Sequence, residues 1–292
     1  MDKIIFIVNP FSGTTNKSDF KSIVESTLET THFSPIIRYT EYAGHGNILA
    51  SEAVHDGIDT VVAVGGDGTV NEVAQALVGT DTNLGIIPAG SGNGFSRHLH
   101  IPIHTKRAIE VINKKDITKV DTCSVNDHFF INVAGIGFDA KIAYLTKHNN
   151  QRGFLPYFKA TMKESLNVEH ADLEIYADDQ VIKGRYISAI VANASRYGYQ
   201  FTVAPKADIM DGIFDITLIK EAPVYRYFMS AYRFLNKTVD RSRLVDTVKA
   251  SKITIKSKKP IHFHVDGEAI APTDSYHFVM NPQSLKVISG PL

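Results

Sequence analysis

Residues 64–72 read Val64-Gly65-Gly66-Asp67-Gly68-Thr69-Val70-Asn71-Glu72 and lie between a buried apolar run and a helical apolar pattern. Three glycines around one aspartate let the backbone turn tightly and approach a ligand without Cβ atoms in the way. The helix that follows presents unpaired N–H groups and a positive dipole end, which favour a phosphate. Asp67 stands where a carboxylate holds phosphate-bound Mg²⁺ or orients a nucleotide. The alternative is an ordinary strand-to-helix turn with a capping aspartate.

Strand and helix patterns alternate around this turn. Ile4 to Val8 is a continuous apolar run of strand length, and further strands are expected at Pro35 to Thr40, Thr60 to Val64 and Leu84 to Ile87. Helical spacing of apolar residues follows in Phe20 to Leu28, in the segment after Gly46 and in Thr69 to Val78. This alternation predicts βαβ units and a doubly wound parallel sheet that is covered on both faces.

Two further glycine-containing loops follow predicted strands. The first is Asn9-Pro10-Phe11-Ser12-Gly13, and the second is Pro88-Ala89-Gly90-Ser91-Gly92-Asn93-Gly94. In a doubly wound sheet such loops gather at the carboxyl edge, where nucleotides bind. Neither loop has the Walker pattern, and no GxGxxG follows the first strand, so P-loop ATPases and standard Rossmann dehydrogenases are disfavoured.

The alternation of strand and helix patterns ends near residues 118–122, where we expect a domain boundary. Short β-rich segments dominate beyond it, namely Phe129–Val133, Leu173–Tyr176, Tyr186–Ala192, Phe214–Ile219, Lys252–Lys256, Ile261–Val265 and Tyr276–Met280. The turns expected between strands include Asn126-Asp127, Asp178-Asp179 and Asp266-Gly267. This pattern predicts an antiparallel β-sandwich crossed by one or two helices, near Leu155–Leu166 and Val224–Leu235.

Composition narrows the class of protein. A length of 292 residues favours two domains at about 150 residues each. The balance of 31 Lys+Arg against 31 Asp+Glu argues against a nucleic-acid binder. The single cysteine, Cys123, excludes an intramolecular disulfide framework, and we expect it to be a small buried apolar residue. No apolar run reaches the roughly 20 residues of a membrane span and the N-terminus lacks a secretory signal, so the sequence predicts a soluble, cytoplasmic protein.

Taken together, the motifs resemble a known family of enzymes. Asn9-Pro10-x-Ser12-Gly13, Gly65-Gly66-Asp67-Gly68-Thr69 and Gly90-Ser91-Gly92-Asn93 resemble the diacylglycerol kinase catalytic-domain family of soluble lipid kinases, related to sphingosine and ceramide kinases. The likeness continues through Thr40…Gly44-His45, Gly135-Ile136-Gly137-Phe138-Asp139, Asp211-Gly212 and Val265-Asp266-Gly267-Glu268. It therefore spans nearly the whole chain in the expected order.

The resemblance implies ATP, with Mg²⁺, bound in a cleft between an α/β nucleotide domain (residues 1–120) and a β-sandwich lipid-substrate domain (residues 121–282), with residues 283–292 returning to the first. By motif match, nucleotide contacts are expected from Thr40, Gly65, Gly66, Asp67, Gly68, Thr69, Asn71, Glu72, Gly90, Ser91, Gly92 and Asn93. Asn9, Gly13 and Lys17 are expected beside the phosphates.

The resemblance also assigns the remaining chemical roles. Glu268 matches the general base toward the lipid hydroxyl, and Asp67 is the other essential carboxylate. One carboxylate that accepts or orients the hydroxyl proton agrees with the needs of phosphoryl transfer. The alternative for Glu268 is an exposed turn acid. Asp211, with main-chain carbonyls near Asp208 and Ile213, matches a structural Mg²⁺ site.

Gly94 departs from the family pattern, because diacylglycerol kinases usually carry aspartate there and sphingosine and ceramide kinases a small residue. Asp121 remains present where a further acid of the substrate-side network is expected. The departure puts diacylglycerol in doubt as the substrate more than it does kinase activity. Two other functions stay open: a kinase for a soluble substrate, of the NAD kinase type, and a nucleotide-binding regulator without turnover.

Two features of the second half remain ambiguous. Residues 1–120 carry a net charge of −3 and residues 121–292 a net charge of +3, and nine Lys+Arg fall within residues 233–259. Aromatic residues of Val224–Leu235 precede this basic segment, which suits transient contact with anionic lipid headgroups, but we favour a core-facing aromatic stripe followed by a solvated hairpin. His262 and His264 share one strand face, and we expect an exposed or cleft-lining polar face rather than a metal site.

Overall fold

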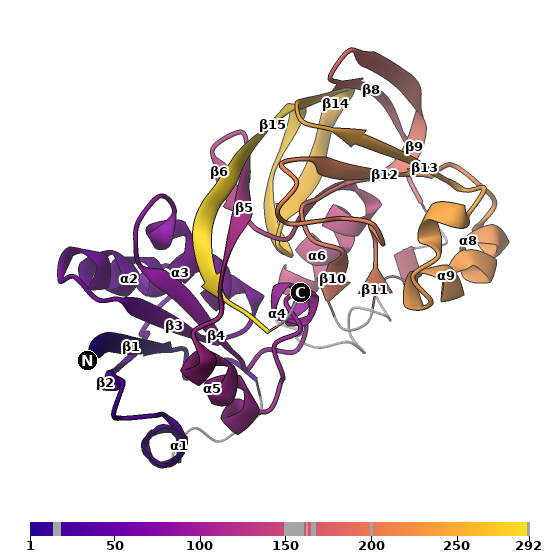
Figure 1. Cartoon of the computed structure of the whole chain (residues 1–292). Coiled ribbons are helices and arrows are strands. Elements are labelled where there is room, and N and C mark those ends of the chain that lie inside the picture. The colour runs from indigo at the N-terminus through magenta and orange to yellow at the C-terminus, as the bar shows by residue number, and fades with distance from the viewer. Residues whose placement is uncertain (14–18, 149–160, 162, 165–167, 199–200, 291–292) are drawn as a thin grey trace. The chain divides into compact units, whose positions relative to one another are not determined.

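The computed structural model describes residues 1–13, 19–148, 161, 163–164, 168–198 and 201–290 (Figure 1). The chain divides into two compact units, one of Met1–Val120 with Gln283–Leu292 and the other of Asp121–Pro282. The first unit alternates strands and helices, and the second consists mostly of antiparallel strands. The fold class expected from the sequence is therefore confirmed.

A parallel sheet forms the centre of the first unit. Its order is β4 (Asn83–Pro88), β3 (Thr60–Gly65), β1 (Asp2–Val8) and β2 (Phe33–Tyr39). Beside β4 runs the end of β15 (Glu268–Ile288), where Val287 lies opposite Leu84. Ile4 to Val8 are buried without a break, as expected of a central strand covered on both faces.

Helices cover both faces of this sheet, with α2 and α3 on one side and α1 and α5 on the other (Figure 1). Their bounds are α1 Phe20–Thr27, α2 His45–His55, α3 Asp67–Leu77, α4 Gly94–His98 and α5 Thr105–Lys114. Each amphipathic helix turns its apolar face to the strands; α3, for example, buries Val70, Val73, Ala74 and Leu77. This arrangement leaves the loops after the strands at one edge of the sheet.

Two long strands organise the second unit. Strands β9 (Gln180–Ala192) and β14 (Ile253–Val265) each pair with β8 (Ala171–Ala177) along one half and with β7 (Val133–Gly137) along the other. The remaining strands are β5 Ile117–Val125, β6 His128–Phe130, β10 Arg196–Gly198, β11 Phe201–Thr202, β12 Phe214–Lys220 and β13 Val245–Ala250.

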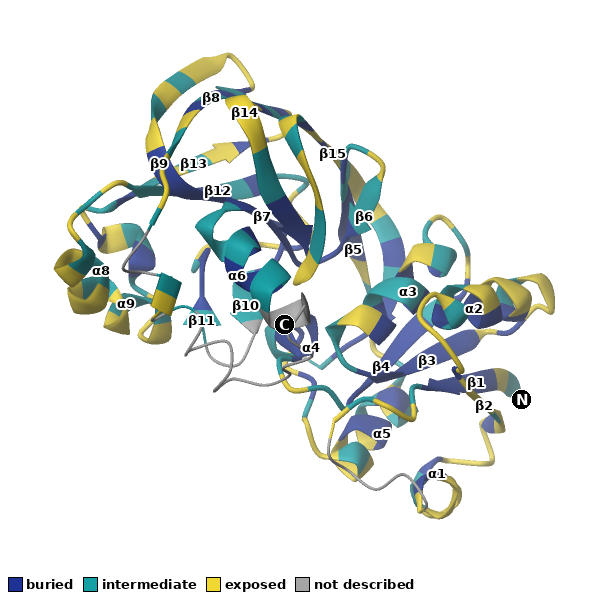
Figure 2. Cartoon of the chain, turned by 180° about the vertical axis from the view of Figure 1, so that it is seen from behind, coloured by how far each residue is buried: buried dark blue, intermediate teal, exposed yellow. Residues whose placement is uncertain are grey.

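The core of the second unit is aromatic and apolar. Phe130, Phe214 and Phe278 lie with their ring centroids 6.1 to 6.4 Å apart, which is within the range of favourable aromatic pairs. Figure 2 shows the buried residues running along the inner parts of the long strands. Cys123 belongs to this core, and its burial raises the pKa of the thiol. Its expected role as a small apolar core residue is confirmed.

Several sequence expectations for the second unit are corrected. The strand expected over Phe129–Val133 is interrupted, because the N–H groups of Ile131, Asn132 and Val133 bind the carboxylate of Asp266 instead of a neighbouring strand. Lys252–Lys256 and Ile261–Val265 are parts of the single strand β14. The helix expected near Leu155–Leu166 lies mostly outside the described residues.

The helical segment expected at Val224–Leu235 exists, as α8 (Val224–Ser230) and α9 (Tyr232–Leu235). However, neither helix contains a buried residue, so the core-facing aromatic stripe that we favoured is wrong. A further helix, α6 (Phe138–His148), follows β7 directly. Within the described part of the chain, no helix is long and apolar enough to cross a bilayer.

Candidate active site

The loops predicted to bind phosphate meet at the carboxyl edge of the parallel sheet. Hydrogen bonds of the main chain join them where the strands end. The N–H of Asn9 donates to the carbonyl of Val64 at 3.0 Å, and the N–H of Ala89 donates to the carbonyl of Gly65 at 2.7 Å. The parallel register of β1, β3 and β4 therefore brings together three segments that are far apart in the sequence.

Glycines allow two of these loops to touch through their main chains. A Cβ atom on Gly66 would lie 3.1 Å from the Cα atom of Gly90, and a Cβ atom on Gly90 would overlap the Cα atom of Gly66. The third loop approaches as closely, because a Cβ atom on Gly13 would overlap the carbonyl oxygen of Ala89. Gly13 also has a φ of +67°, which other residues rarely adopt. The glycines are thus required by contact between the loops themselves.

Side chains complete this arrangement at Asn9 and Thr69. The amide nitrogen of Asn9 donates to the hydroxyl oxygen of Thr69 at 3.0 Å, and its amide oxygen accepts from the N–H of Phe11 at 2.9 Å. Thr69 lies against Gly65, where any Cβ atom would overlap the threonine hydroxyl. The loop after β1 is therefore attached to the first turn of α3, which begins at Asp67.

Glu72 supports the loop that contains Thr40. Its two carboxylate oxygens accept hydrogen bonds from the N–H groups of Gly44 and Gly46, at 2.8 and 3.0 Å. Thr40 is buried, and its N–H donates to the carbonyl of Val8 at 2.9 Å. Glu72 thus holds the start of α2 beside the same edge of the sheet.

The other predicted nucleotide contacts belong to the same loops. Asn93 is buried in the left-handed conformation, and its amide bonds to both the N–H and the carbonyl of Gly90, at 3.0 and 2.8 Å. Ser91 is exposed in this loop, while Gly68 is exposed and Asn71 half-buried in the first turns of α3. Gly92 is half-buried. Lys17 lies outside the described residues.

Glu268 lies in the second unit, at the end of a tight hairpin. Val265 of β14 pairs with Glu268 of β15, so the loop consists of Asp266 and Gly267 alone. Both have positive φ, +49° and +85°, as a type I′ turn requires. Glu268 itself is exposed. We call Val265–Glu268 the hairpin tip.

Asp266 fixes the hairpin tip to a neighbouring segment. Its carboxylate oxygens accept hydrogen bonds from three successive N–H groups, those of Ile131, Asn132 and Val133, each at 3.0 Å. The N–H of Asp266 in turn donates to the carbonyl of Val133 at 2.8 Å. Because these three residues are buried, the carboxylate satisfies donors that water does not reach.

His264 fixes the hairpin tip from within β14. Its Nδ1 accepts a hydrogen bond from the N–H of Gly267 at 3.3 Å, so the ring proton lies on Nε2. Nε2 is 3.1 Å from Oδ2 of Asp139, which also accepts from the hydroxyl of Tyr197 at 2.8 Å. The hydroxyl of Ser188 donates to the other oxygen of Asp139 at 2.6 Å. The tip beside Glu268 is therefore tied to a buried polar network.

This network corrects our expectation for the histidine pair. His264 is fully buried, with no exposed surface, and is not part of an exposed polar face. His262 is half-buried and lies over Tyr144, with ring centroids 4.9 Å apart. Among the described residues no cluster of three or more His, Cys, Asp or Glu has the geometry of a metal site. The sequence spacing of His262 and His264 predicts that they share a strand face. It does not reveal that their partners are Asp139 and Tyr144, which lie far away in the sequence.

The residues matched to a structural Mg²⁺ site lie in the loop before β12. Asp208 and Asp211 each accept, through one oxygen, the N–H of the residue two positions ahead, at 3.0 Å. The second oxygen of Asp211 is 3.5 Å from Nζ of Lys249, which also pairs with Asp215 at 2.9 Å. Burial lowers the pKa of Lys249, but these carboxylates outweigh it and the net shift is upward, so a fixed positive charge already faces Asp211. One carboxylate opposed by an ammonium group fits a dehydrated Mg²⁺ poorly, and Ile213 contributes only its main chain.

Asp121 holds this loop in place. It is fully buried, its carboxylate accepts the N–H of Gly212 at 2.7 Å, and its own N–H donates to the carbonyl of Ile209 at 2.7 Å. The acid that the sequence indicated for a substrate-side network thus has a structural role toward residues 209–212.

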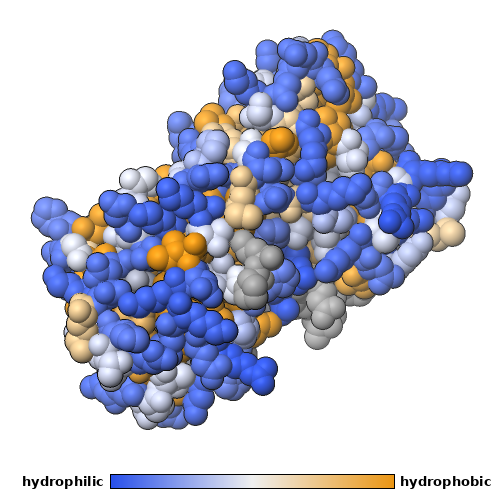
Figure 3. All heavy atoms as spheres, in the orientation of Figure 1, coloured by the Kyte–Doolittle hydropathy of each residue, from blue (hydrophilic) through white to orange (hydrophobic). Residues whose placement is uncertain are grey.

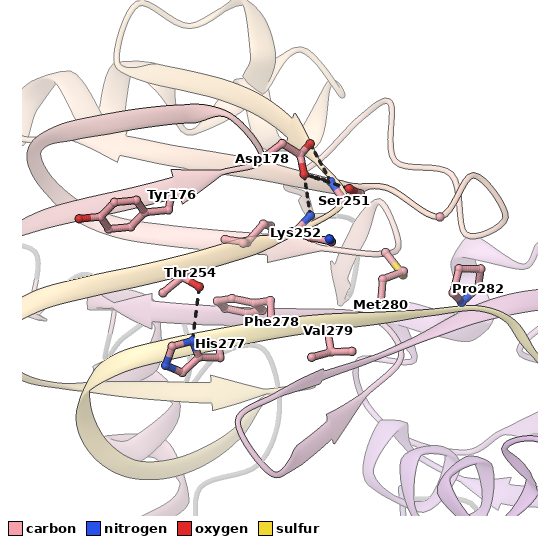
Figure 4. Close-up of a pocket in the computed structure, with 12 residues that line it drawn as sticks. Tyr176, Asp178, Ser251, Lys252, Thr254, His277, Phe278, Val279, Met280 and Pro282 are labelled. Carbon is pink, nitrogen blue, oxygen red and sulfur yellow. Dashed lines mark hydrogen bonds between the residues drawn. The ribbon is translucent and has the colours of Figure 1, made fainter.

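A hollow of about 570 Å³ lies elsewhere in the second unit (Figure 4). Its polar side chains bond to one another. Asp178 accepts from the N–H groups of Ser251 and Lys252, and Thr254 lies 3.3 Å from His277. None of the predicted site residues lines it; its lining is Tyr176, Asp178, Gly212, Ser251, Lys252, Ile253, Thr254, His277, Phe278, Val279, Met280 and Pro282. The hollow therefore adds nothing to the candidate site.

Comparison with known proteins agrees with this division of the chain. The model of the diacylglycerol kinase catalytic domain matches residues 3–125, and that of the YegS C-terminal NAD kinase beta sandwich-like domain matches residues 132–289. The second match covers more than half of the chain. The chain therefore belongs to the family that carries this C-terminal domain, here joined to a diacylglycerol kinase catalytic domain, and the resemblance inferred from the motifs is confirmed.

Relatives and solved structures define the class further. A diacylglycerol kinase of Bacillus subtilis (strain 168) is 28% identical over 274 residues, covering 92% of this chain and 90% of its own length. One of Staphylococcus aureus (strain bovine RF122 / ET3-1) is 29% identical over 271 residues, covering 90% and 84%. The crystal structure of a diacylglycerol kinase from Bacillus anthracis str. Sterne shares the fold, with a TM-score of 0.79 at 23% identity over 99% of this chain and 97% of that chain. The chain is a lipid kinase, a phosphotransferase with an alcohol group as acceptor.

Proposed function

We propose that this protein transfers the γ-phosphoryl group of ATP to a free hydroxyl group of a lipid, diacylglycerol-like or sphingoid. The observation that carries the proposal is the contact between Gly66 and Gly90, which brings two glycine loops together at the carboxyl edge of the sheet without intervening side chains. Such an edge is where doubly wound folds bind nucleotides. The loops around it contain the residues proposed to contact ATP: Asn9, Gly13, Lys17, Thr40, Gly65, Gly66, Gly68, Thr69, Asn71, Glu72, Gly90, Ser91, Gly92 and Asn93.

Not all of these residues are proposed to act in the same way. Both oxygens of Glu72 already accept N–H groups of the Thr40 loop, and Asn93 closes its own loop onto Gly90. We therefore assign both a positioning role. The N-terminal end of α3, with its positive dipole end, is the element suited to phosphate oxygens. Mg²⁺, when bound with the phosphates, neutralises their charge, and Asp67 at the first turn of α3 is the carboxylate suited to hold it.

Glu268 is the proposed general base. Its carboxylate accepts the proton of the lipid hydroxyl as the oxygen attacks the γ-phosphorus, and ADP leaves with the electron pair of the broken bond. Glu268 is exposed at the end of a tight turn, a position from which a side chain can meet a substrate. Asp266 and His264 hold the main chain on either side of the turn, so we propose that they are positioning residues for Glu268.

The metal site proposed at Asp208, Asp211 and Ile213 remains a separate proposal with little support from the contacts. Lys249 already balances the charge of Asp211, so no step of the reaction is derived through a metal at that place. Loss of stability on exhaustive chelation of the nucleotide-free protein, restored by Mg²⁺, would support the site. An unchanged melting temperature would argue against it.

The function is tested by incubating the protein with labelled ATP and a total lipid extract of its source organism, and by identifying the product by mass. We expect a phosphorylated lipid. Separate reactions with dispersed diacylglycerol and a sphingoid base decide the substrate class that Gly94 leaves open. A reaction with NAD tests the soluble-substrate alternative, to which the description of the matched C-terminal domain as NAD kinase-like gives some weight. Nucleotide binding without turnover of any acceptor would favour a regulator and contradict the proposal.

A lipid acceptor resides in a bilayer, so the proposal includes transient contact of the protein with a membrane surface. The proposal involves no nucleic acid, in keeping with the zero net charge of the chain.

A further inference from the structure

Helices α8 and α9 expose a row of large apolar side chains. Ala231 between them keeps helical dihedrals, φ −57° and ψ −35°, so helical spacing continues from one to the other. Tyr225, Phe228, Met229 and Tyr232 stand at positions i, i+3, i+4 and i+7 and therefore share one face. Their exposed fractions are 59%, 44%, 69% and 51%, and Leu235 beyond them is 50% exposed. We call these five residues the α8–α9 stripe.

The opposite face attaches the helices to the second unit. The hydroxyl of Tyr227 accepts the N–H of Ala222 at 2.6 Å and donates to the carbonyl of Lys220 at 3.1 Å. Phe234 packs against a small buried cluster that includes Ile190 and Val203. Tyr227 and Phe234 therefore attach the helices to the second unit and fix their orientation. The residues of the stripe point outward because of this fixed orientation. Figure 2 shows the two helices with mostly exposed and partly exposed residues.

The face seen in Figure 3 is mostly hydrophilic, with its apolar side chains in small groups. Isolated exposed apolar residues need no explanation, but consecutive ones on one helical face mark an interaction surface. In α8 and α9 the five residues of the stripe occupy the outer face, whereas an ordinary surface helix would place most of its large apolar residues inward.

The charges around the stripe select one kind of partner. Residues 224–243 contain Arg226, Arg233, Lys237, Arg241 and Arg243 but a single acid, Asp240, which pairs with Lys206 at 3.1 Å. Arg233 lies over the ring of Tyr232, 5.3 Å from its centroid. Aromatic and apolar side chains surrounded by basic groups suit the boundary of an anionic bilayer, where the rings enter the headgroup region and the cations meet lipid phosphates.

We propose that the α8–α9 stripe docks the second unit onto the surface of an anionic lipid bilayer. The inference deepens the proposed function and rests on it for one point only, namely that the acceptor lipid resides in such a bilayer. The stripe binds by shallow insertion of Phe228, Met229 and Tyr232, while the basic side chains beside it supply the preference for anionic lipid. Each basic group near the surface is expected to contribute about fivefold to partitioning.

Sedimentation with vesicles tests the proposal directly. The full chain is mixed with vesicles of phosphatidylcholine alone or of phosphatidylcholine with about one third phosphatidylglycerol. We expect the anionic vesicles to bind at least about tenfold more protein, with the difference reduced at high salt. Phe228→Ser with Met229→Ser should lower the binding about tenfold, because two exposed apolar side chains leave the interface. Equal binding to both vesicles, or unchanged binding of this double variant, would overturn the proposal.

A matched control uses apolar residues of similar exposure elsewhere. Ile36 and Val181 are 43% and 54% exposed and lie in β2 and β9. Ile36→Ser with Val181→Ser should bind anionic vesicles like the unaltered protein. A loss equal to that of the stripe variant would mean that general surface hydrophobicity causes the binding, and would contradict the stripe.

The absence of tryptophan from the chain allows a local probe. Tyr232→Trp introduces a single tryptophan in the stripe, whose emission should shift to the blue on addition of anionic vesicles and should be quenched by lipids brominated near the headgroup. Val181→Trp should show neither effect. If the emission of the Tyr232→Trp protein stays unchanged while that protein sediments with vesicles, the membrane contact lies elsewhere and the assignment is overturned.

The alternative occupant is a second copy of this chain. Sedimentation velocity at the concentration of the vesicle assay distinguishes the two, because the proposal expects the same mass for the unaltered protein and the stripe variant. A dimer that dissociates in Phe228→Ser with Met229→Ser would identify the stripe as a subunit interface and overturn the proposal.

A water-soluble short-chain lipid separates docking from catalysis. If the stripe variant still phosphorylates this soluble lipid, the stripe serves docking and not catalysis. If vesicle binding depends on the stripe but no form of the protein shows turnover, only the proposed function is rejected.

Discussion

In the first unit, loops from β1, β3 and β4 meet main chain to main chain, with Gly66 against Gly90 and Gly13 against Ala89. In the second unit, Glu268 stands on a two-residue turn that the side chains of Asp266 and His264 hold. Main-chain contact requires glycine where the loops meet, whereas side-chain anchoring holds the turn beside an exposed carboxylate. The difference agrees with the proposed function, in which the first unit binds phosphate and the second presents a base.

Side-chain anchoring recurs within the second unit. Three tight turns begin with a residue in the left-handed conformation, Asn126, Asp178 and Asp266. The side chain of each accepts N–H groups of a neighbouring segment: Asn126 that of His277, Asp178 those of Ser251 and Lys252, and Asp266 those of residues 131–133. The second unit thus uses polar side chains where the first unit uses contacts between glycines.

The largest effect is expected from Asp266→Ala. The substitution leaves three buried N–H groups without an acceptor and places alanine at a φ of +49°, which should cost about 3 to 5 kcal/mol. Asp266→Asn keeps the left-handed turn and one oxygen for two of the N–H groups, so it should cost less than half as much. Calorimetric melting of both variants measures this. Equal destabilisation would mean that the carboxylate does not anchor the tip.

The corresponding test in the first unit is Gly90→Ala. Its Cβ atom would overlap the Cα atom of Gly66, so the two loops must separate, at a cost of about 2 to 3 kcal/mol and with loss of nucleotide affinity. Gly68→Ala is the control for stability, because space is open at its Cβ position and it lies within α3. It should be neutral or stabilising by up to about 1 kcal/mol. Comparable melting of Gly90→Ala and Gly68→Ala would reject the main-chain contact.

His264→Phe is expected to have a smaller effect than Asp266→Ala and Gly90→Ala, and to act on turnover. The variant loses the acceptor of the Gly267 N–H and the partner of Asp139. We expect kcat for lipid phosphorylation to fall about tenfold, the value of roughly one hydrogen bond, with the KM for ATP unchanged. His264→Asn, which returns an acceptor near Nδ1, should recover part of the loss. A rise in the KM for ATP instead would assign His264 to general stability.

The smallest effect is expected from Asp178→Asn, at an anchored turn with no catalytic residue. Main-chain hydrogen bonds from Lys252 and then Ser251 lower the pKa of Asp178 below its usual 3.8. A lowered pKa in the folded state stabilises the protein above about pH 4, and this contribution is lost as the pH falls through the folded value. The variant should therefore melt slightly lower at pH 7, and the difference should shrink as the pH falls below 3.8. A difference that grows toward pH 3 would contradict the assignment.

The sequence predicts the first unit better than the second. Continuous apolar strands, helical spacing and glycine loops are local patterns, and the parallel register then brings the loops together without further information. In the second unit the turns Asn126-Asp127, Asp178-Asp179 and Asp266-Gly267 were also predictable, because left-handed positions restrict the residue type.

The anchors were not predictable, for a physical reason. Asp266 reaches residues more than 130 positions away, and His264 and Asp139 are 125 positions apart. No local pattern encodes such contacts. The outward orientation of α8 and α9 was misjudged likewise, since aromatic residues at helical spacing indicate an apolar face but not whether the core or a membrane covers it. Tyr227 and Phe234, which settle the orientation, differ from their neighbours only in their tertiary partners.

The most direct test of the account is the kinetics of Glu268→Gln. The substitution keeps the size of an exposed side chain and removes only its charge, so ATP affinity should not change. The melting temperature is measured in parallel, which separates a loss of turnover from a loss of stability. We expect kcat for lipid phosphorylation to fall by about 10² to 10⁴, the contribution of a general base. Full turnover in a Glu268→Gln protein that binds ATP normally would show that the anchored hairpin does not present the base, and would contradict the division of roles between the two units.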